Sequence, residues 1–281
     1  ASQSILGAIL KVLVTAFMEN KQFTPKEKPK KTPEKKTEFF DFSPEQTARM
    51  AETFFGLTEE ELAVFKNRIA KNEGHVRIFV HPFYVSAHPE SYARRSEIHG
   101  YDDISQEEAA KHLEEGFLKT VRSVADNKDS APLIIFEEES QIEETRKAIL
   151  EKLQRESLNF AESGIIFSPT EQGRGAPHRK QIVSVYENVR EPAERSEVFY
   201  EAAQKIYEEI LSTLNIQSGT MGGAYFDDWY RPGDELGACA GNVRKTFNHL
   251  NIPINLSRYT ISPREQLKKH YPTKQTREKD L

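Results

Sequence analysis

Six short runs rich in apolar residues mark the chain between residues 75 and 257. Most of them contain β-branched and aromatic side chains, and the run that ends in three glutamates is continuously apolar, which is typical of a strand buried on both faces. Pro82 interrupts the first run, so its regular part is expected to end near Val80 or His81. The predicted strands lie in HVRIFV (75–80), APLIIFEEE (131–139), SGIIFSP (163–169), QIVSVYE (181–187), IQSGTMGGAYF (216–226) and IPINLS (252–257).

Segments with helical spacing separate these runs. Helices are expected over residues 105–125, 140–158 and 194–214, the first two beginning at serine N-caps, and a shorter one over residues 243–250. Strands that alternate with helices of this length pair in parallel through right-handed crossovers. The sequence therefore predicts an α/β fold for residues 75–262, a three-layer α/β/α sandwich with a mostly parallel sheet.

Two further helices with clear end signals precede this domain. The motif SPEQ (43–46) combines an N-cap, a proline at the first helical position and a capping-box glutamine, and Gly56 ends that helix. The motif TEEE (58–61) begins a second helix that runs to about Lys71. We interpret this helical pair, residues 39–74, as a cap on the main domain.

The two ends of the chain differ in composition from the rest. Residues 1–18 contain an apolar helix, SILGAILKVLVTAFM, which is shorter than the roughly twenty residues of an ordinary membrane span. Docking on the domain or self-association through residues 4–18 is expected, with membrane-surface contact as the alternative. Residues 19–38 are rich in Lys, Pro and Glu and predict a disordered linker. Residues 263–281 predict a polar C-terminal tail.

Composition narrows the classes of function. The 281 residues carry a net charge of -5, which argues against nucleic-acid binding because such binding normally needs a basic surface. Seventeen phenylalanines and ten tyrosines provide a substantial core, although only 37% of the residues are apolar. The single cysteine excludes an intrachain disulfide and a cysteine-based zinc or iron–sulfur site. A cytoplasmic location is favoured, and membrane association through the N-terminal helix is the alternative.

Chemically capable side chains follow the predicted strands. Ligands of open parallel sheets bind outside the carboxyl ends of the strands, so these side chains are expected at one edge. His81, Glu138 and Asp227 are candidate catalytic residues and have the ligand types of a divalent metal site. Alternatively, the histidine is a surface or capping residue and the glutamates only favour the next helix start. The strand-end groups are His81, Tyr84, His88, Glu137, Glu138, Glu139, Ser168, Thr170, Asp227, Asp228, Ser257 and Arg258.

Two segments favour a small anionic ligand. A helix that starts between Gly237 and Gly241 would direct its free N–H groups into the preceding polar loop. The loop PTEQGRGAPHRK (169–180) is basic in an acidic protein, and arginine binds carboxylate or phosphate bidentately. The same loop can be an ordinary exposed hairpin between two strands. The predicted ligand-binding residues are Arg174, His178, Arg179, Gly237, Gly241 and Asn242.

Cys239 lies at the same predicted helix start, where the helix dipole would lower the pKa of its thiol. This arrangement loosely resembles that of isochorismatase-like hydrolases, in which an Asp after the first strand, a Lys and a Cys at a helix start form the triad. The chain departs from that pattern because His81 follows its first strand, no lysine is clearly placed, and a long polar insert precedes Cys239. Cys239 is thus a candidate nucleophile, and a packed small residue is the alternative.

Two functions from different classes follow from these patterns. The first is an enzyme, a hydrolase that acts on a small anionic substrate at the carboxyl ends of the strands. The second is a non-catalytic ligand-binding or protein-interaction module that is tethered by its N-terminal helix. Ionisable groups with shifted pKa values in one cleft would favour the enzyme.

Overall fold

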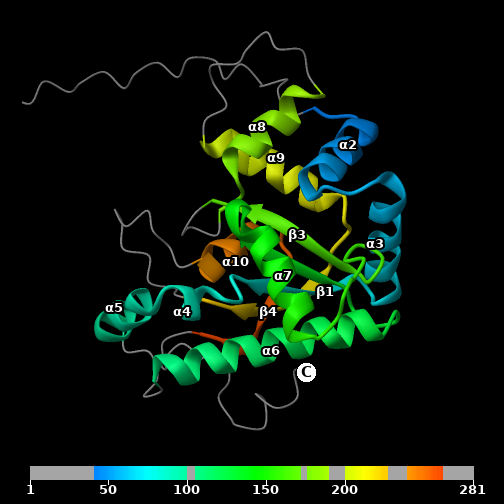
Figure 1. Ribbon diagram of the computed structural model, residues 1–281. Helices are drawn as coiled ribbons and strands as arrows, with labels where there is room; N and C mark the ends of the chain where they lie inside the picture. Colours follow the sequence, from blue (N-terminus) through cyan, green and yellow to red (C-terminus); the bar gives the residue numbers. More distant parts are fainter. Residues whose placement is uncertain (1–40, 100–104, 172–175, 190–199, 227–238, 262–281) are drawn as a thin grey trace, which may run out of the picture. The chain divides into compact units, whose positions relative to one another are not determined.

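The computed structural model places a parallel α/β sheet in the main part of the chain (Figure 1). The predicted N-terminal helix (1–18), linker (19–38) and C-terminal tail (263–281) lie outside the described residues. The structure describes residues 41–99, 105–171, 176–189, 200–226 and 239–261.

The sheet has five strands, all parallel to their neighbours, in the order β3-β2-β1-β4-β5. The predicted α/β fold with a parallel sheet is confirmed. From β1 the chain builds β2 and β3 on one side and then crosses to build β4 and β5 on the other. The strands are β1 (His75–Val80), β2 (Leu133–Glu138), β3 (Ile165–Thr170), β4 (Ser218–Gly223) and β5 (Ile254–Thr260).

Helices precede and connect these strands. The pair α2 and α3 comes before β1, and α10 links β4 to β5. The described helices are α2 (Pro44–Phe55), α3 (Glu59–Lys71), α4 (Tyr84–Ala87), α5 (Pro89–His99), α6 (Gln106–Asp126), the 3-10 turn η2 (Glu139–Gln141), α7 (Ile142–Lys152), α8 (Arg179–Glu187), α9 (Tyr200–Ser212) and α10 (Cys239–His249).

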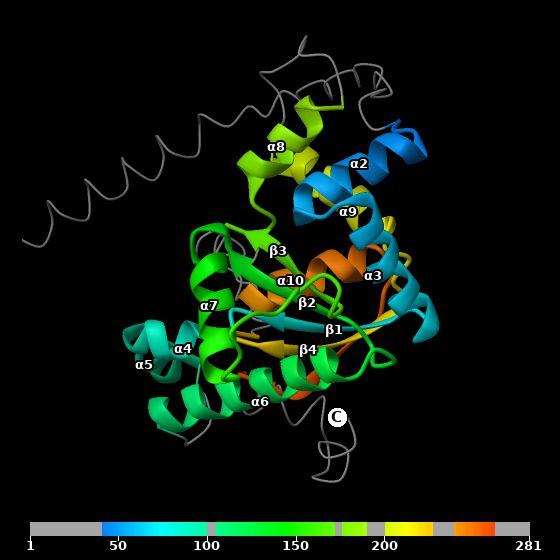
Figure 2. The same cartoon turned by 45° about the vertical axis from the view of Figure 1, so that its right-hand side comes forward.

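Side chains of the sheet alternate between two helical layers. Ile135 of β2 belongs to the core that α6 covers, whereas the next residue, Phe136, lies against Phe247 of α10 on the opposite face. On that second face, the hydroxyl groups of Tyr207 in α9 and Ser168 in β3 are 2.7 Å apart and hydrogen-bonded. Figures 1 and 2 show α6 and α9 on opposite sides of the sheet. The three-layer arrangement is therefore confirmed.

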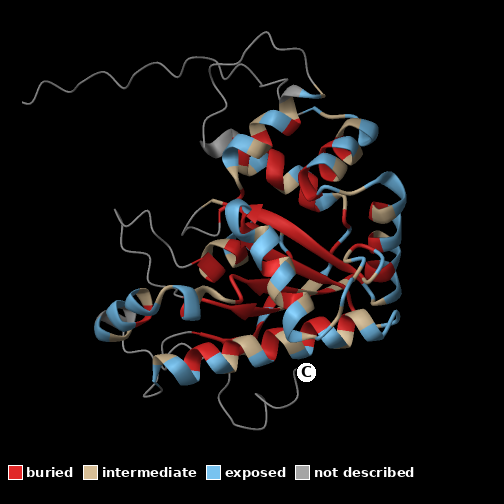
Figure 3. Ribbon diagram, viewed as in Figure 1, coloured by how far each residue is buried: buried red, intermediate tan, exposed pale blue. Residues whose placement is uncertain are grey.

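Burial of the central strands accounts for their composition. Every residue of β2 and β3 is buried, as Figure 3 shows by its red strands. A strand covered by helices on both faces has no polar side, which explains the continuous apolar run in β2. Its two final glutamates, Glu137 and Glu138, are buried with it.

Local sequence signals set the starts of three helices. Ser43, Thr58 and Ser105 each accept a hydrogen bond from the backbone N–H three residues later, and the side chain at that position bonds back to complete a capping box. Gly56 ends α2 with a φ of 64°, in the left-handed region that glycine adopts without strain. These ends agree with the predicted positions.

The strand predicted over QIVSVYE (181–187) is wrong, because the segment belongs to helix α8. Its buried residues, Ile182 and Val185, are three positions apart and the residues between them are more exposed, which is helical spacing. This face packs on α2 and α9. The β-branched content that suggested a strand is overridden by that tertiary packing. The loop before it therefore joins a strand to a helix, and the hairpin alternative is also wrong.

Two other predicted boundaries need correction. The helix expected over residues 140–158 ends at Lys152, and the chain then turns through Gln154, whose φ is 55°. The helix expected over residues 194–214 is described only from Tyr200 to Ser212, since residues 190–199 lie outside the described ranges. The short helices α4 and α5 were not predicted, because their residues show little apolar periodicity.

Candidate functional site

The carboxyl ends of β1 and β2 bring the best candidate residues together. The backbone N–H of His81 donates to the carbonyl of Phe136 over 2.9 Å, so the ladder continues one residue past β1. Val80 is paired with Phe136 on one side and with Gly223 of β4 on the other. The strand order reverses between β1 and β4, and open α/β sheets bind ligands at such a switch point.

His81 is the centre of this edge. It is only 1% exposed, and its φ of 47° turns the chain away from the strand direction. Its Nε2 lies 3.3 Å from the Thr170 hydroxyl at the end of β3. Its Nδ1 lies 3.6 Å from the Glu137 carboxyl and 4.0 Å from that of Glu138. Nδ1 has no hydrogen-bond partner among the described residues, so one polar atom of a buried ring remains available.

Glu137 faces His81 from the end of β2. Its carboxyl oxygens accept hydrogen bonds from the Glu138 backbone N–H and from the Thr145 hydroxyl of α7, both 2.9 Å long. Burial raises the pKa of Glu137 to about 7, because a charged carboxylate loses its hydration there. At neutral pH this carboxyl is therefore divided between its acid and ionised forms.

The pKa of His81 moves the other way. Burial, with a smaller effect from the charge of His88, lowers the pKa of His81 to about 4. The imidazole is therefore neutral near pH 7 and can accept a proton. Titratable groups with pKa values shifted in opposite directions meet at a distance of 3.6 Å.

Aromatic side chains surround this pair. The ring of Tyr84 in α4 packs edge-on to His81, with centroids 5.8 Å apart, and also edge-on to Tyr225, again 5.8 Å away. The ring of His88 also packs on Tyr84, with centroids 4.4 Å apart. The loop after β1 and the segment after β4 thus contribute apolar surface next to the ionisable pair.

The predicted catalytic residues are distributed as follows. Glu138 lies at the same edge as His81. Cys239 is the first residue of α10 and is 2% exposed, and the N–H of the next residue, Ala240, donates to the carbonyl of Tyr225. Asp227 lies outside the described residues.

The described members of the predicted ligand-binding set are His178, Arg179, Gly241 and Asn242. Gly241 and Asn242 lie in the first turn of α10. His178 and Arg179 are close to acidic groups, as detailed below. Arg174 and Gly237 lie outside the described residues.

Acidic groups already accompany the basic side chains after β3. Nε2 of His178 is 3.0 Å from the Glu139 carboxylate, and Nε of Arg179 is 3.8 Å from that of Glu171. The N–H of His178 also donates to the carbonyl of Pro169, which folds this loop back on β3. An anion bound here would have to compete with these carboxylates.

A glutamate of the triplet 137–139 was predicted as the acid or base, but Glu138 was chosen over Glu137, and Thr145 was not singled out. Side chains two apart on a strand share a face, so Leu133, Ile135 and Glu137 all point toward the layer that contains α7. That alternation is the signal that separates Glu137 from Glu138. Thr145 has no comparable signal, because it is an ordinary position of a helix in sequence.

The predicted divalent-metal site is supported only by the types of its side chains, not by their arrangement. Within the described ranges, no group of three or more His, Cys, Asp or Glu side chains is arranged to hold a metal ion. Of the suggested set, His81 and Glu138 are described, and Asp227 is not.

Comparisons of the chain with protein-family models, curated proteins and solved structures gave no match. The function therefore has to be argued from the site itself. Across the parts of the chain that the structure describes, no helix combines the length and apolar character needed to cross a membrane.

Proposed function

We propose that the protein is an enzyme that uses Glu137 and His81 for proton transfer to and from a small substrate, most simply a hydrolase. The observation that carries this proposal is the 3.6 Å approach of Nδ1 of His81 to the Glu137 carboxyl at the carboxyl edge of the sheet. Pairs of titratable groups whose environments shift their pKa values apart are typical of acid–base sites.

The two side chains suit complementary roles. Glu137, with a pKa of about 7, can supply the proton that a leaving group needs. His81 is neutral at that pH and can take a proton from an attacking water at Nδ1, while Nε2 donates to the Thr170 hydroxyl. Thr170 would then fix the tautomer and the orientation of the ring.

A small anionic substrate remains the proposed class. Its support is the sequence before α10 together with the α10 N-terminus, which lies next to the segment that follows β4, where the Ala240 N–H donates to the Tyr225 carbonyl. Arg179 adds positive charge on the β3 side, and Glu171 partly offsets it.

One observation favours the alternative, a non-catalytic ligand-binding or interaction module. His81 is 1% exposed and Glu137 is 5% exposed. Buried polar groups with several internal contacts also serve to fix one packing arrangement of a fold. In that case the His81–Glu137 pair would hold the ends of β1 and β2 together without reacting.

The test is turnover of a panel of chromogenic carboxylic esters, amides and phosphate esters by the native chain and two variants. Glu137→Gln and His81→Gln should each lower kcat by roughly a hundredfold or more, since general acid–base groups typically contribute that much. His249→Gln, at an exposed histidine of α10, is the matched control and should retain native activity.

Circular dichroism of each variant separates lost chemistry from lost folding. Hydrolysis that survives in folded Glu137→Gln and His81→Gln would contradict the assigned roles. A native protein that turns over no member of the panel would favour the interaction module.

A further inference from the structure

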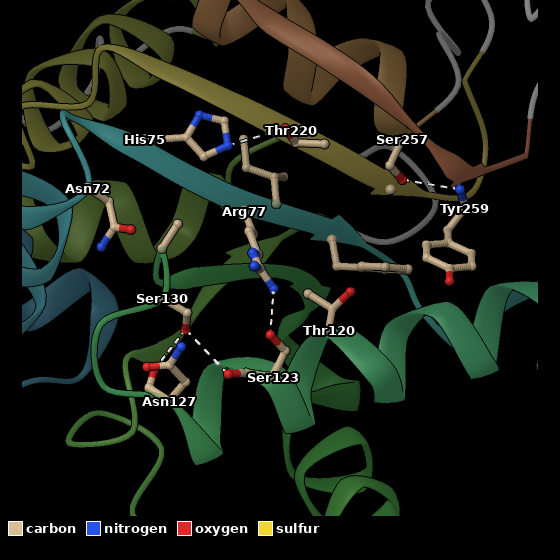
Figure 4. Close-up of a pocket in the computed structure, with 14 residues that line it drawn as sticks. Asn72, His75, Arg77, Thr120, Ser123, Asn127, Ser130, Thr220, Ser257 and Tyr259 are labelled. Atoms are coloured by element: carbon tan, nitrogen blue, oxygen red, sulfur yellow. Dashed lines mark hydrogen bonds between the residues drawn. The ribbon is translucent and has the colours of Figure 1, made fainter. Parts of the chain in front are cut away.

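A cavity of about 480 Å³ lies between α6 and the strands β1, β4 and β5. It is separate from the pair at the strand ends. Arg77, which lines it, precedes His81 by four residues, which corresponds to about 13 Å along a strand. Figure 4 shows the Arg77 side chain directed from β1 toward α6.

Arg77 brings an uncompensated positive charge to this cavity. Its Nη1 donates to the Ser123 hydroxyl of α6 over 3.1 Å. Across the described residues this is its one side-chain hydrogen bond, and no carboxylate lies within ion-pair distance of it. A guanidinium has five N–H donors, so most of its bonding capacity is available inside the cavity.

The positive charge of Arg77 acts on its neighbours. Burial is the main cause that lowers the pKa of Arg68 and the pKa of His75. The nearby charge of Arg77 lowers both pKa values further. Asp129 acts on Arg68 in the opposite direction but makes no ion pair with Arg77 among the described residues. Burial also lowers the pKa of Arg77. Among the described residues, no carboxylate forms an ion pair with this half-buried cation.

Hydroxyl groups form part of the cavity wall, together with apolar side chains such as Ile78 and Phe79. The hydroxyls belong to Thr120 of α6, Thr220 of β4, and Ser257 and Tyr259 of β5. The Thr120 hydroxyl donates to the Gly116 carbonyl and the Thr220 hydroxyl bonds to His75, whereas the Ser257 hydroxyl accepts from the Tyr259 N–H and keeps its own proton for a guest. A cationic fork beside such a donor is the chemistry that recognises an oxyanion.

We propose that this cavity binds a small molecule through a carboxylate or phosphate group. Arg77 is the main residue that contacts this group, and Ser123 holds the guanidinium in place. The cavity volume falls within the range of small-molecule sites. The proposal is independent of the reaction at the strand ends, because it involves neither His81 nor Glu137.

The experiment is calorimetric titration of the native chain with three probes: acetate, succinate and inorganic phosphate. Arg77→Met should weaken binding of the preferred probe at least about tenfold, since it removes the bidentate donor. Arg122→Met removes the same charge from an exposed position next to Ser123 and should leave the affinity unchanged. Binding of succinate alone or of phosphate alone identifies the class of the natural ligand.

Urea unfolding without any probe separates binding from structure. Arg77→Met should be no less stable than the native chain, because it removes a half-buried charge that lacks a counterion. Ser123→Leu keeps Arg77 but fills the cavity from a helical position, and it should also abolish binding. The proposal is overturned if no probe binds at about 20 mM, or if the affinity in Arg77→Met or in Ser123→Leu equals that of the native chain.

Discussion

Folding changes which residue of the His81–Glu137 pair holds a proton. In the unfolded chain the ordinary pKa values are 6.5 for histidine and 4.5 for glutamate, and in the folded chain they are about 4 and about 7. Between pH 4.5 and 6.5 the unfolded chain protonates His81, whereas the folded chain protonates Glu137. Both states then bind one proton, so the pair adds no pH dependence to the free energy of unfolding in that window.

Single variants should reveal the two opposing contributions. Glu137→Gln leaves the depressed pKa of His81. Below pH 6.5 the unfolded chain then binds a proton that the folded chain does not, so the free energy of unfolding should rise by about 1.4 kcal/mol per pH unit from pH 4.5 to 6.5, relative to the native chain. His81→Gln leaves the raised pKa of Glu137, and the free energy should fall at the same rate as pH rises. Urea unfolding at several pH values measures both slopes.

The control for this experiment is Glu144→Gln, at an exposed glutamate of α7. Its profile should run parallel to that of the native chain. His88 and Glu138 are the other charged groups beside the pair, and they are unchanged in every variant. Parallel profiles for all four proteins would show that the pair is not shifted as described.

Residue-scale chemistry was predictable where it depended on position along a strand. The end of β1 at His81 could be predicted from Pro82 and from the edge rule for parallel sheets. The charge state of His81 was not predictable, because it depends on burial at the sheet edge and on the charge of His88, which no local pattern encodes.

At the scale of elements, the side chain of Arg68 connects α3 to the end of α6, to the segment that follows α6 and to the turn before β3. Its guanidinium donates to the carbonyls of Ser163, Val124, Asn127 and Ser130 over 2.6 to 3.1 Å, and the residue is 5% exposed. One side chain thereby satisfies carbonyls at the end of α6 and at the turn before β3. A buried donor with several acceptors is costly to remove, because the carbonyls of Ser163 and Val124 then lose this donor.

Replacement of Arg68 by Met should therefore lower the free energy of unfolding by roughly 3 kcal/mol or more. Arg68→Lys should recover little of it, since an ammonium cannot reproduce the planar fork that spans these carbonyls. Arg49→Met, at an exposed position of α2, should change stability by less than about 0.5 kcal/mol. Chemical denaturation of the three variants measures these changes in the free energy of unfolding. Native stability in Arg68→Lys would contradict the explanation that Arg68 stabilises the fold by bonding to several carbonyls.

Element types were predictable where a local signal agreed with the packing. The capping boxes at Ser43, Thr58 and Ser105 define their helices independently of the rest of the chain. Helix α8 has no such box, and its His178 N-cap position makes no side-chain cap bond. Its helical form depends on contacts with α2 and α9, which are distant in sequence, so composition alone pointed to a strand.

At the scale of the whole molecule, parallel pairing followed from the alternation of strands and helices, but the strand order did not. Several orders are compatible with right-handed crossovers, and the observed one requires the chain to pass from β3, at one edge, to β4 beside β1. That crossing creates the switch point next to His81. The order β3-β2-β1 also brings Thr170, 89 positions later in the chain, to His81, which no sequence pattern anticipates.

The part of the chain needed for this fold can be tested by truncation. A chain that starts at residue 39 retains the Ser43 cap and all of α2, and it should keep a cooperative unfolding transition because the buried core of the described residues is intact and residues 19–38 contain almost no apolar side chains. A chain that starts at residue 58 loses the buried Met50, Phe54 and Phe55, each worth about 1.5 to 3 kcal/mol.

The shorter chain should consequently be strongly destabilised, because Phe54 packs against the ring of Tyr207 in α9, with centroids 5.2 Å apart, and its removal exposes a layer of the domain. Calorimetric melting of the three proteins compares them directly. Loss of the transition in the chain that starts at residue 39 would place residues 1–38 in the core. Equal melting of the chain that starts at residue 58 would make α2 an appendage, and the α2–α9 contact would then contribute nothing to the stability of the sheet.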